Sequence, residues 1–260
     1  MKMVSLRAAA VALAGACALS AASPAVAGAI ARQGFELPAE GVKIVVFRPD
    51  VHVGSLRIGG LDEPNAEWTV AARENIQHAM EVRAGGMHTS LVFLDDLEGE
   101  HAELLTQYRG LFETVAGAMT QHVTLGDRLP TKQAEITVPG RSKPRKVPQL
   151  DWTLGEGARE LKEVTGADYA MFVFTHDAYG DTGRKVAQVL MAGLFGAYVP
   201  AGVHIGYAGL VDLETGDIVW FNTDLAMGGD PRDEEGSKRR VDQLMNGFPS
   251  HAPLVAETGN

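Results

Sequence analysis

Several side chains that can bind a metal ion or transfer a proton follow the apolar runs of this sequence. They are Arg48, Asp50, His52, Asp95, His176, Asp177 and Asp181. If the runs are parallel strands of one sheet, their carboxyl ends meet at the edge where such sheets bind ligands. Two histidines and several carboxylates gathered there would suit a divalent cation or acid–base chemistry.

These residue types also have ordinary structural roles. Aspartates at strand ends commonly cap the next helix or turn, and histidines in loops are often simply solvated. The spacing matches no metal-ligand pattern, and HExxH is absent. Phosphate-binding glycine patterns and the GxSxG and SxxK nucleophile motifs are absent as well. The sequence therefore names no catalytic residue, no metal ligand and no cofactor.

The first 27 residues predict a signal peptide. Lys2 and Arg7 precede the apolar run 8–22, and Ala25-Val26-Ala27 offers a small-x-small cleavage site. We therefore expect a periplasmic protein of bacterial type. An alternative is lipidation at Cys17, which would anchor the chain to the outer membrane; the preceding Ala14 is a poor match to a lipobox.

Charge and cysteine content exclude several classes of function. The chain carries 23 basic and 33 acidic residues. Two of the basic residues lie in the leader, so residues 28–260 carry a net charge of −12. Such an acidic surface repels nucleic acid. Cys17 is the only cysteine, so the exported part has no disulfide and no thiol nucleophile.

Three apolar runs without alternation predict strands covered on both faces, as in a parallel sheet between helices. Helical spacing of apolar residues lies between them, with Leu111 and Phe112 on the inward stripe of the second helix. A tight turn at 214–217, with Gly216 in the left-handed region, predicts a hairpin. The strands are expected at 42–47, 90–94, 169–174, 203–213 and 218–223, and the helices at 64–83, 101–122, 153–165, 184–197 and 233–246.

This order predicts one α/β domain over residues 28–260, with an insertion around 101–150. Its architecture is a layered domain in which helices pack on a mixed sheet. The sheet has parallel core strands and a C-terminal antiparallel hairpin.

A stretch rich in glycine and alanine runs from about 186 to 211 and carries no charge. Small residues at Gly193, Gly196 and Gly202 allow backbones to approach closely, either in self-association or at a membrane. Pro200 interrupts the stretch, so we expect no membrane-spanning helix. Trp220 on the return strand is either a partner contact or a core residue.

Three segments, 43–47, 161–174 and 209–221, resemble a group of bacterial envelope proteins. The group includes the curli secretion channel subunit, the lipoprotein activators of penicillin-binding proteins and the N-terminal domain of the Tol-Pal translocation protein. In that group a GADY-like turn leads into a core strand, and a hairpin reading LVDLxTGxIVW follows. The resemblance implies a fold and a role in protein contacts at the envelope without catalysis. The longer 101–150 segment departs from the group.

We therefore expect a non-enzymatic interaction or assembly protein of the envelope. Its expected partners are envelope proteins and further copies of itself, with contact to a membrane surface left open. The alternative is a periplasmic metal-binding protein or hydrolase that uses the His/Asp rim.

Overall fold

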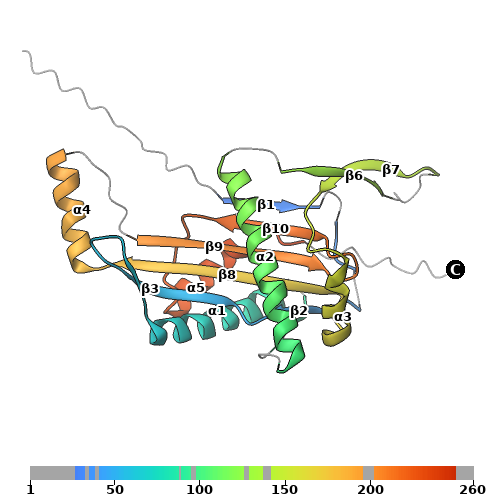
Figure 1. Ribbon diagram of the computed structural model, residues 1–260, viewed down its shortest axis with the longest axis horizontal. Helices are drawn as coiled ribbons and strands as arrows, with labels where there is room; N and C mark the ends of the chain where they lie inside the picture. Colours follow the sequence, from blue (N-terminus) through green and yellow to red (C-terminus); the bar gives the residue numbers. More distant parts are fainter. Residues whose placement is uncertain are drawn as a thin grey trace, which may run out of the picture.

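The computed structural model describes residues 27–32, 35–38, 41–87, 89–94, 98–125, 129–136, 142–195 and 202–249. Its centre is one mixed sheet with helices packed on both faces, as Figure 1 shows. The predicted α/β class is confirmed. The strands of the sheet are β1 (Ala27–Ala31), β2 (Ile44–Phe47), β3 (Asp50–Leu56), β4 (Asp62–Pro64), β5 (Leu91–Leu94), β8 (Tyr169–Gly180), β9 (Gly202–Asp212) and β10 (Ile218–Asp224).

The parallel core lies where the unbroken apolar runs predicted it. The strand order is β1-β10-β9-β8-β2-β5, and β2 is parallel to both of its neighbours. All four residues of β2 are buried. A strand that is apolar on both faces is stable only when layers cover both sides. This explains why the runs beginning at Val42, Ser90 and Tyr169 lie side by side.

The predicted hairpin is formed by β9 and β10, which pair antiparallel. Gly216 in its turn has a φ of 75°. A Cβ at that position would lie 2.0 Å from the carbonyl oxygen of Gly155, so a side chain is excluded there. β1 extends the hairpin by pairing antiparallel with β10.

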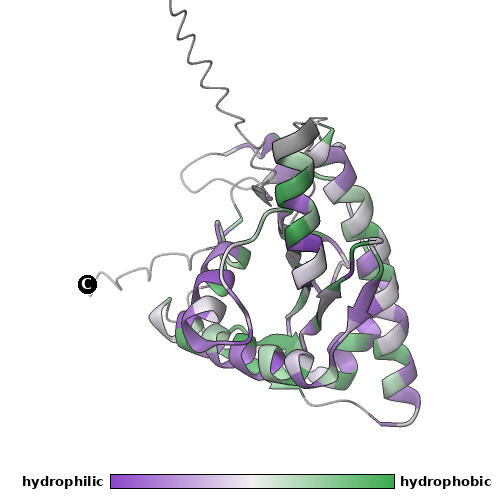
Figure 2. Ribbon diagram, turned by 90° about the vertical axis from the view of Figure 1, so that its left-hand side faces the viewer, coloured by the Kyte–Doolittle hydropathy of each residue, from purple (hydrophilic) through white to green (hydrophobic). Residues whose placement is uncertain are grey.

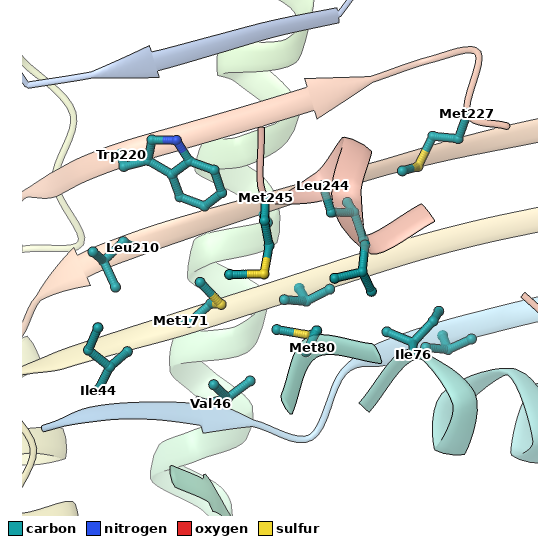
Figure 3. Packing of buried hydrophobic residues seen from close by; sticks show 14 of the residues in the cluster. Ile44, Val46, Ile76, Met80, Met171, Leu210, Trp220, Met227, Leu244 and Met245 are labelled. Carbon is teal, nitrogen blue, oxygen red and sulfur yellow. The ribbon is translucent and has the colours of Figure 1, made fainter. Parts of the chain in front are cut away.

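One face of the sheet is covered by α1 (Ala66–Gly86) and α5 (Glu234–Leu244). Each helix begins at a polar cap: Asn65 accepts a hydrogen bond from the backbone N of Trp68, and Asp233 accepts one from Gly236. Figure 3 shows the core that results, in which methionine and leucine side chains of the helices meet the sheet. Its labelled residues are Ile44, Val46, Ile76, Met80, Met171, Leu210, Trp220, Met227, Leu244 and Met245.

The opposite face is covered by α2 (Glu100–Thr124), the 3-10 turn η1 (Glu156–Ala158) and α3 (Arg159–Thr165). Phe112 of α2 stacks on Phe172 of β8 with ring centroids 4.6 Å apart. The predicted inward stripe was wrong at Leu111, which is 40% exposed. Leu105 and Ala116 are buried instead, because the inward face of α2 is centred on Phe112 and Met119.

The segment between α2 and η1 forms a small separate sheet. β6 (Thr131–Ile136) pairs antiparallel with β7 (Arg145–Leu150). Lys132 joins it to the main hairpin through an ion pair with Asp217, 3.0 Å between Nζ and Oδ1. None of the helices in the described ranges combines the length and apolar composition that crossing a bilayer requires.

Candidate functional site

Four of the predicted rim residues, Asp50, His52, His176 and Asp177, lie within strands, because two strands differ from the expectation. β8 continues to Gly180, so His176 and Asp177 are inside it and not beyond its end. The segment that holds Asp50 and His52 forms β3, which runs parallel to the second half of β8. In this register His52 lies opposite His176, and Val53 lies opposite Asp177.

Strand alternation then places His176 and Asp177 on opposite faces of the sheet. His176 faces the side of α2, together with His52. Asp177 faces the side of α5 and has no exposed surface. The rim expected from the sequence is therefore two separate groups with the sheet between them.

The group on the α2 side consists of two histidine–carboxylate pairs. His52 Nε2 lies 2.9 Å from Asp50 Oδ1, and His176 Nε2 lies 2.9 Å from Asp62 Oδ2. The two imidazole rings stack with centroids 6.3 Å apart. The His52 side chain is 54% exposed, so water screens this group strongly. In the part of the chain that the structure describes, no three His, Cys, Asp or Glu side chains are placed to hold a metal ion.

The other predicted residues of the rim are scattered. The carbonyl of Arg48 accepts a hydrogen bond from Arg109 of α2 at 3.1 Å. Asp181 accepts one from the backbone N of Arg184 at 2.7 Å and so caps the next helix. Asp95 lies outside the described residues, as do Cys17 and the predicted signal peptide up to residue 26.

The group on the α5 side is a buried charge cluster that sequence reasoning missed. Asp177 Oδ1 accepts a hydrogen bond from Arg240 Nη2 at 2.6 Å and lies 2.7 Å from His204 Nδ1. Asp177 and Arg240 are both fully buried. Arg240 also donates to the carbonyl oxygen of Gly229 at 2.7 Å. Because an ionised carboxylate only accepts, His204 Nδ1 carries the proton in this pair. The cluster joins β8, β9 and α5.

The ring of Tyr179 packs against His204, and Arg232 and Trp68 lie next to Tyr179. The Tyr179 ring lies 4.9 Å from the His204 ring, centroid to centroid. The Arg232 guanidinium lies between the rings of Tyr179 and Trp68, at 4.0 Å and 4.4 Å from their centroids. Arg232 also makes a forked pair with Asp230 and thereby lowers the pKa of Asp230 to about 2. Burial raises the pKa of Tyr179. These contacts hold the ring of His204 in place.

Two of the four predicted interaction residues, Gly202 and Trp220, pack within this chain. A Cβ on Gly202 would lie 2.6 Å from the carbonyl oxygen of Ala178 and 2.9 Å from His204 Nε2. Trp220 is completely buried in the core beside α5, which matches the core interpretation of this residue. Gly193 lies in α4 (Thr182–Phe195), whereas Gly196 lies outside the described residues.

α4 stands beyond the ends of β8 and β9, at one end of the sheet (Figure 1). Several of its exposed positions are apolar: Val186, Val189 and Leu190 are 54%, 71% and 54% exposed. Figure 2 looks onto this end of the molecule and shows green, apolar turns along α4. Ile58 in the β3–β4 turn contacts Gly183 at the base of α4.

Six exposed apolar side chains thus gather at this end, and we call them the apolar tip. They are Ile58, Leu61, Val186, Val189, Leu190 and Met191. Only four other large apolar side chains in the described ranges are comparably exposed, and they are Val70, Val82, Leu111 and Leu125. Single exposed apolar residues are normal, but a cluster of this kind marks an interaction surface.

A second surface feature is a groove of about 680 Å³ between α1 and α5. Ala79, Val82 and Val241 give it apolar walls, and charged side chains surround them. The charged and polar residues along it are His78, Arg83, Glu234, Glu235, Lys238 and Asp242.

Comparisons with known proteins give no family. No family model matches the chain, and no curated protein matches it. Among solved structures, two of the PelC dodecamer from Paraburkholderia phytofirmans match it. One is 10% identical over 87% of this chain and 98% of that chain, with a TM-score of 0.37. The other, of a point variant, is 11% identical over 84% and 95%, with a TM-score of 0.34. Superpositions this loose carry no conclusion about this chain.

Proposed function

We propose that this chain is a non-enzymatic protein of the bacterial cell envelope that works by binding other proteins, including further copies of itself. The observation that carries the proposal is the apolar tip. The envelope location rests on the predicted signal peptide and on the resemblance to envelope proteins.

The orientation of α4 supports the proposal. A surface helix normally turns its apolar face toward the core and its polar face toward water. In α4 the partly buried positions are Gly183, Arg184, Ala187 and Gln188, whereas the valines and Leu190 face outward. Full burial of one valine or leucine side chain is worth about 1.5–3 kcal/mol, so covering several of them drives association. The inverted helix is therefore explained by a partner that covers it.

The separation of the histidines from Asp177 also bears on the choice between binding and catalysis. Hydrolysis by paired His and Asp side chains needs them at hydrogen-bond distance around one substrate. Here the pairs His52–Asp50 and His176–Asp62 lie on the α2 side and the pair His204–Asp177 lies on the α5 side, so the predicted rim does not surround one substrate. Among the described residues, none packs over the side chains of the apolar tip.

The experiment is light scattering coupled to size exclusion, with the full chain and two variants. Val189→Glu places a charge on the most exposed residue of the tip, and Val70→Glu makes the same change at an exposed site on α1. We expect the unchanged chain and Val70→Glu to form the same oligomer, and Val189→Glu to form a smaller species. Both variants should unfold at the same denaturant concentration as the unchanged chain, because surface substitutions usually shift stability by less than about 0.5 kcal/mol.

Two results would contradict the proposal. One is an unchanged chain that is monomeric at every concentration and captures no envelope protein. The other is an oligomer whose size Val189→Glu leaves intact.

A further inference from the structure

The groove between α1 and α5 has the chemistry to receive an apolar helix. Val82 on its wall is 59% exposed, and Ala79 and Val241 lie next to it along the groove. Peptide helices dock in such grooves through apolar side chains three and four residues apart. The groove therefore fits a helix with apolar anchors at that spacing.

α4 carries anchors at this spacing. Val186, Val189 and Leu190 stand at positions i, i+3 and i+4, and all three face outward. These positions lie on one side of a helix, one above the other. Another surface helix with an equally exposed apolar stripe is not found in the described ranges.

The charges of the two surfaces are complementary. α4 contains Arg184 and Lys185 in its first turns and no acidic residue. The groove carries exposed Glu234 and Glu235 at the start of α5. Its carboxylates outnumber its lysine and arginine side chains, because Asp242 is present alongside Arg83 and Lys238. Opposite potentials of this kind set the orientation of docking partners.

We propose that α4 of one copy docks into the α1–α5 groove of a second copy. The inference rests on the proposed function, because it names the surfaces through which the chain binds itself. Val186, Val189 and Leu190 would cover Val82 and the neighbouring Ala79, and Lys185 would approach Glu234 and Glu235. A second copy is a better occupant of the groove than an unrelated helix, since the same chain supplies both complementary surfaces.

A lipid surface is the other partner to consider for α4. The chain has a net charge of −10, and anionic lipid headgroups repel an acidic protein. The charge distribution therefore favours a protein groove rich in carboxylates over a membrane surface. Docking into a bilayer remains an outcome that the experiment below distinguishes.

Cysteine cross-linking tests the pairing directly. The chain has one cysteine, so a Cys17→Ala background leaves only introduced thiols. One preparation carries Val189→Cys and the other carries Val82→Cys. We expect mild oxidation of the mixture to give a disulfide-linked dimer that contains one copy of each, because disulfides form only between closely approaching side chains. Mixing separate preparations ensures that the link joins two molecules.

Matched controls define the specificity. Val189→Cys mixed with Val70→Cys, on an exposed part of α1 away from the groove, should cross-link several-fold less. Adding Lys185→Glu to the Val189→Cys preparation should lower the yield of the linked dimer. Adding Glu235→Lys to the Val82→Cys preparation as well should restore that yield. Restoration by charge exchange would not follow from a merely structural role of either residue.

Each other result decides against the inference in a recognisable way. An oligomer in which Val189→Cys links only to itself indicates an α4–α4 contact, and one in which it links to Val70→Cys as readily as to Val82→Cys indicates a contact on α1 outside the groove. Both overturn the groove docking and leave the proposed function standing. A third result overturns both the groove docking and the proposed function. In it, the chain is a monomer that floats with vesicles of phosphatidylethanolamine and phosphatidylglycerol, and the Val189→Glu variant no longer floats with them.

Discussion

Asp177 holds Arg240 and His204 through a single oxygen atom, Oδ1. Asp177 and Arg240 have no exposed surface, so this ion pair is shielded from water. Removing one partner of a buried ion pair leaves the other charge uncompensated, which costs about 3–5 kcal/mol. The neighbouring His176 makes a partly exposed pair with Asp62, and such pairs contribute about 0–1 kcal/mol.

The two adjacent residues should therefore differ sharply in their effect on stability. We expect Asp177→Asn to lower the free energy of unfolding by about 3 kcal/mol or more, and His176→Asn to lower it by less than about 1 kcal/mol. Urea unfolding of both variants measures the difference. Equal losses would mean that Asp177 and Arg240 are not a buried pair.

Asp230 should make stability depend on acid pH. Its pKa is about 2 in the folded chain, against an ordinary value of 3.8, mainly because Arg232 hydrogen-bonds to it. A lowered carboxyl pKa stabilises the fold above the unfolded pKa, and this contribution disappears as pH falls from about 4 toward 2.

We expect Asp230→Asn to cost on the order of 1–2 kcal/mol near neutral pH, after discounting for solvent screening, and little at about pH 2. Denaturant unfolding at the two pH values gives the comparison. A cost that stays constant between them would show that the carboxylate charge is not what the Arg232 contact stabilises.

Residue-level chemistry was the least predictable part of this protein. The sequence predicted one rim, and the structure divides its residues into separate groups, because the polar run from Thr175 to Gly180 continues a strand. Arg240 could have been suspected, since it shares the inward face of its helix with Val241 and Leu244. His204 gave no such signal, because its partner comes from a strand 27 residues earlier.

At the scale of elements, the glycines of β9 explain how helices approach both faces of the sheet. A Cβ on Gly209 would lie 2.5 Å from the Phe112 ring of α2. A Cβ on Gly206, which faces the other side, would lie 2.6 Å from the sulfur of Met227 and 3.2 Å from Leu244 of α5. Gly206 and Gly209 thus allow close packing within the chain.

Gly209→Ala should destabilise the protein by about 1–3 kcal/mol, because the added methyl group overpacks the contact with Phe112. Gly110→Ala is the matched control. It lies in α2 with open space around it, and alanine should stabilise that helix by up to about 1 kcal/mol. Thermal unfolding should move in opposite directions for the two variants. A shift in the same direction would contradict the proposed packing of α2 on β9.

Elements with strong periodicity were predictable, and short polar strands were not. Apolar spacing and the caps located α1 and α5, and the turn at Gly216 located the hairpin. β3 was missed because it contains only two inward valines, Val51 and Val53, between polar residues. It is a strand because it hydrogen-bonds along the edge of the second half of β8. That half of β8 is distant from β3 in the sequence.

At the scale of the whole molecule, the proposed assembly joins two different surfaces, α4 and the groove between α1 and α5. A contact between α4 of one copy and the groove of the next is head-to-tail, so each copy uses both surfaces. Repetition of such a contact closes into a ring or continues as a filament, depending on the rotation between copies. The layered architecture was predictable from hydrophobic pattern. The proposed contact between α4 and the groove was not, because the outward orientation of α4 is visible only in three dimensions.

The Asp177–Arg240 pair also has a consequence for the order in which the chain becomes complete during synthesis. The counter-ion of Asp177 lies 63 residues further along the chain. A chain truncated after β10 therefore lacks Arg240 and leaves Asp177 with His204 alone. We expect such a product to be less stable than the full chain and more easily degraded.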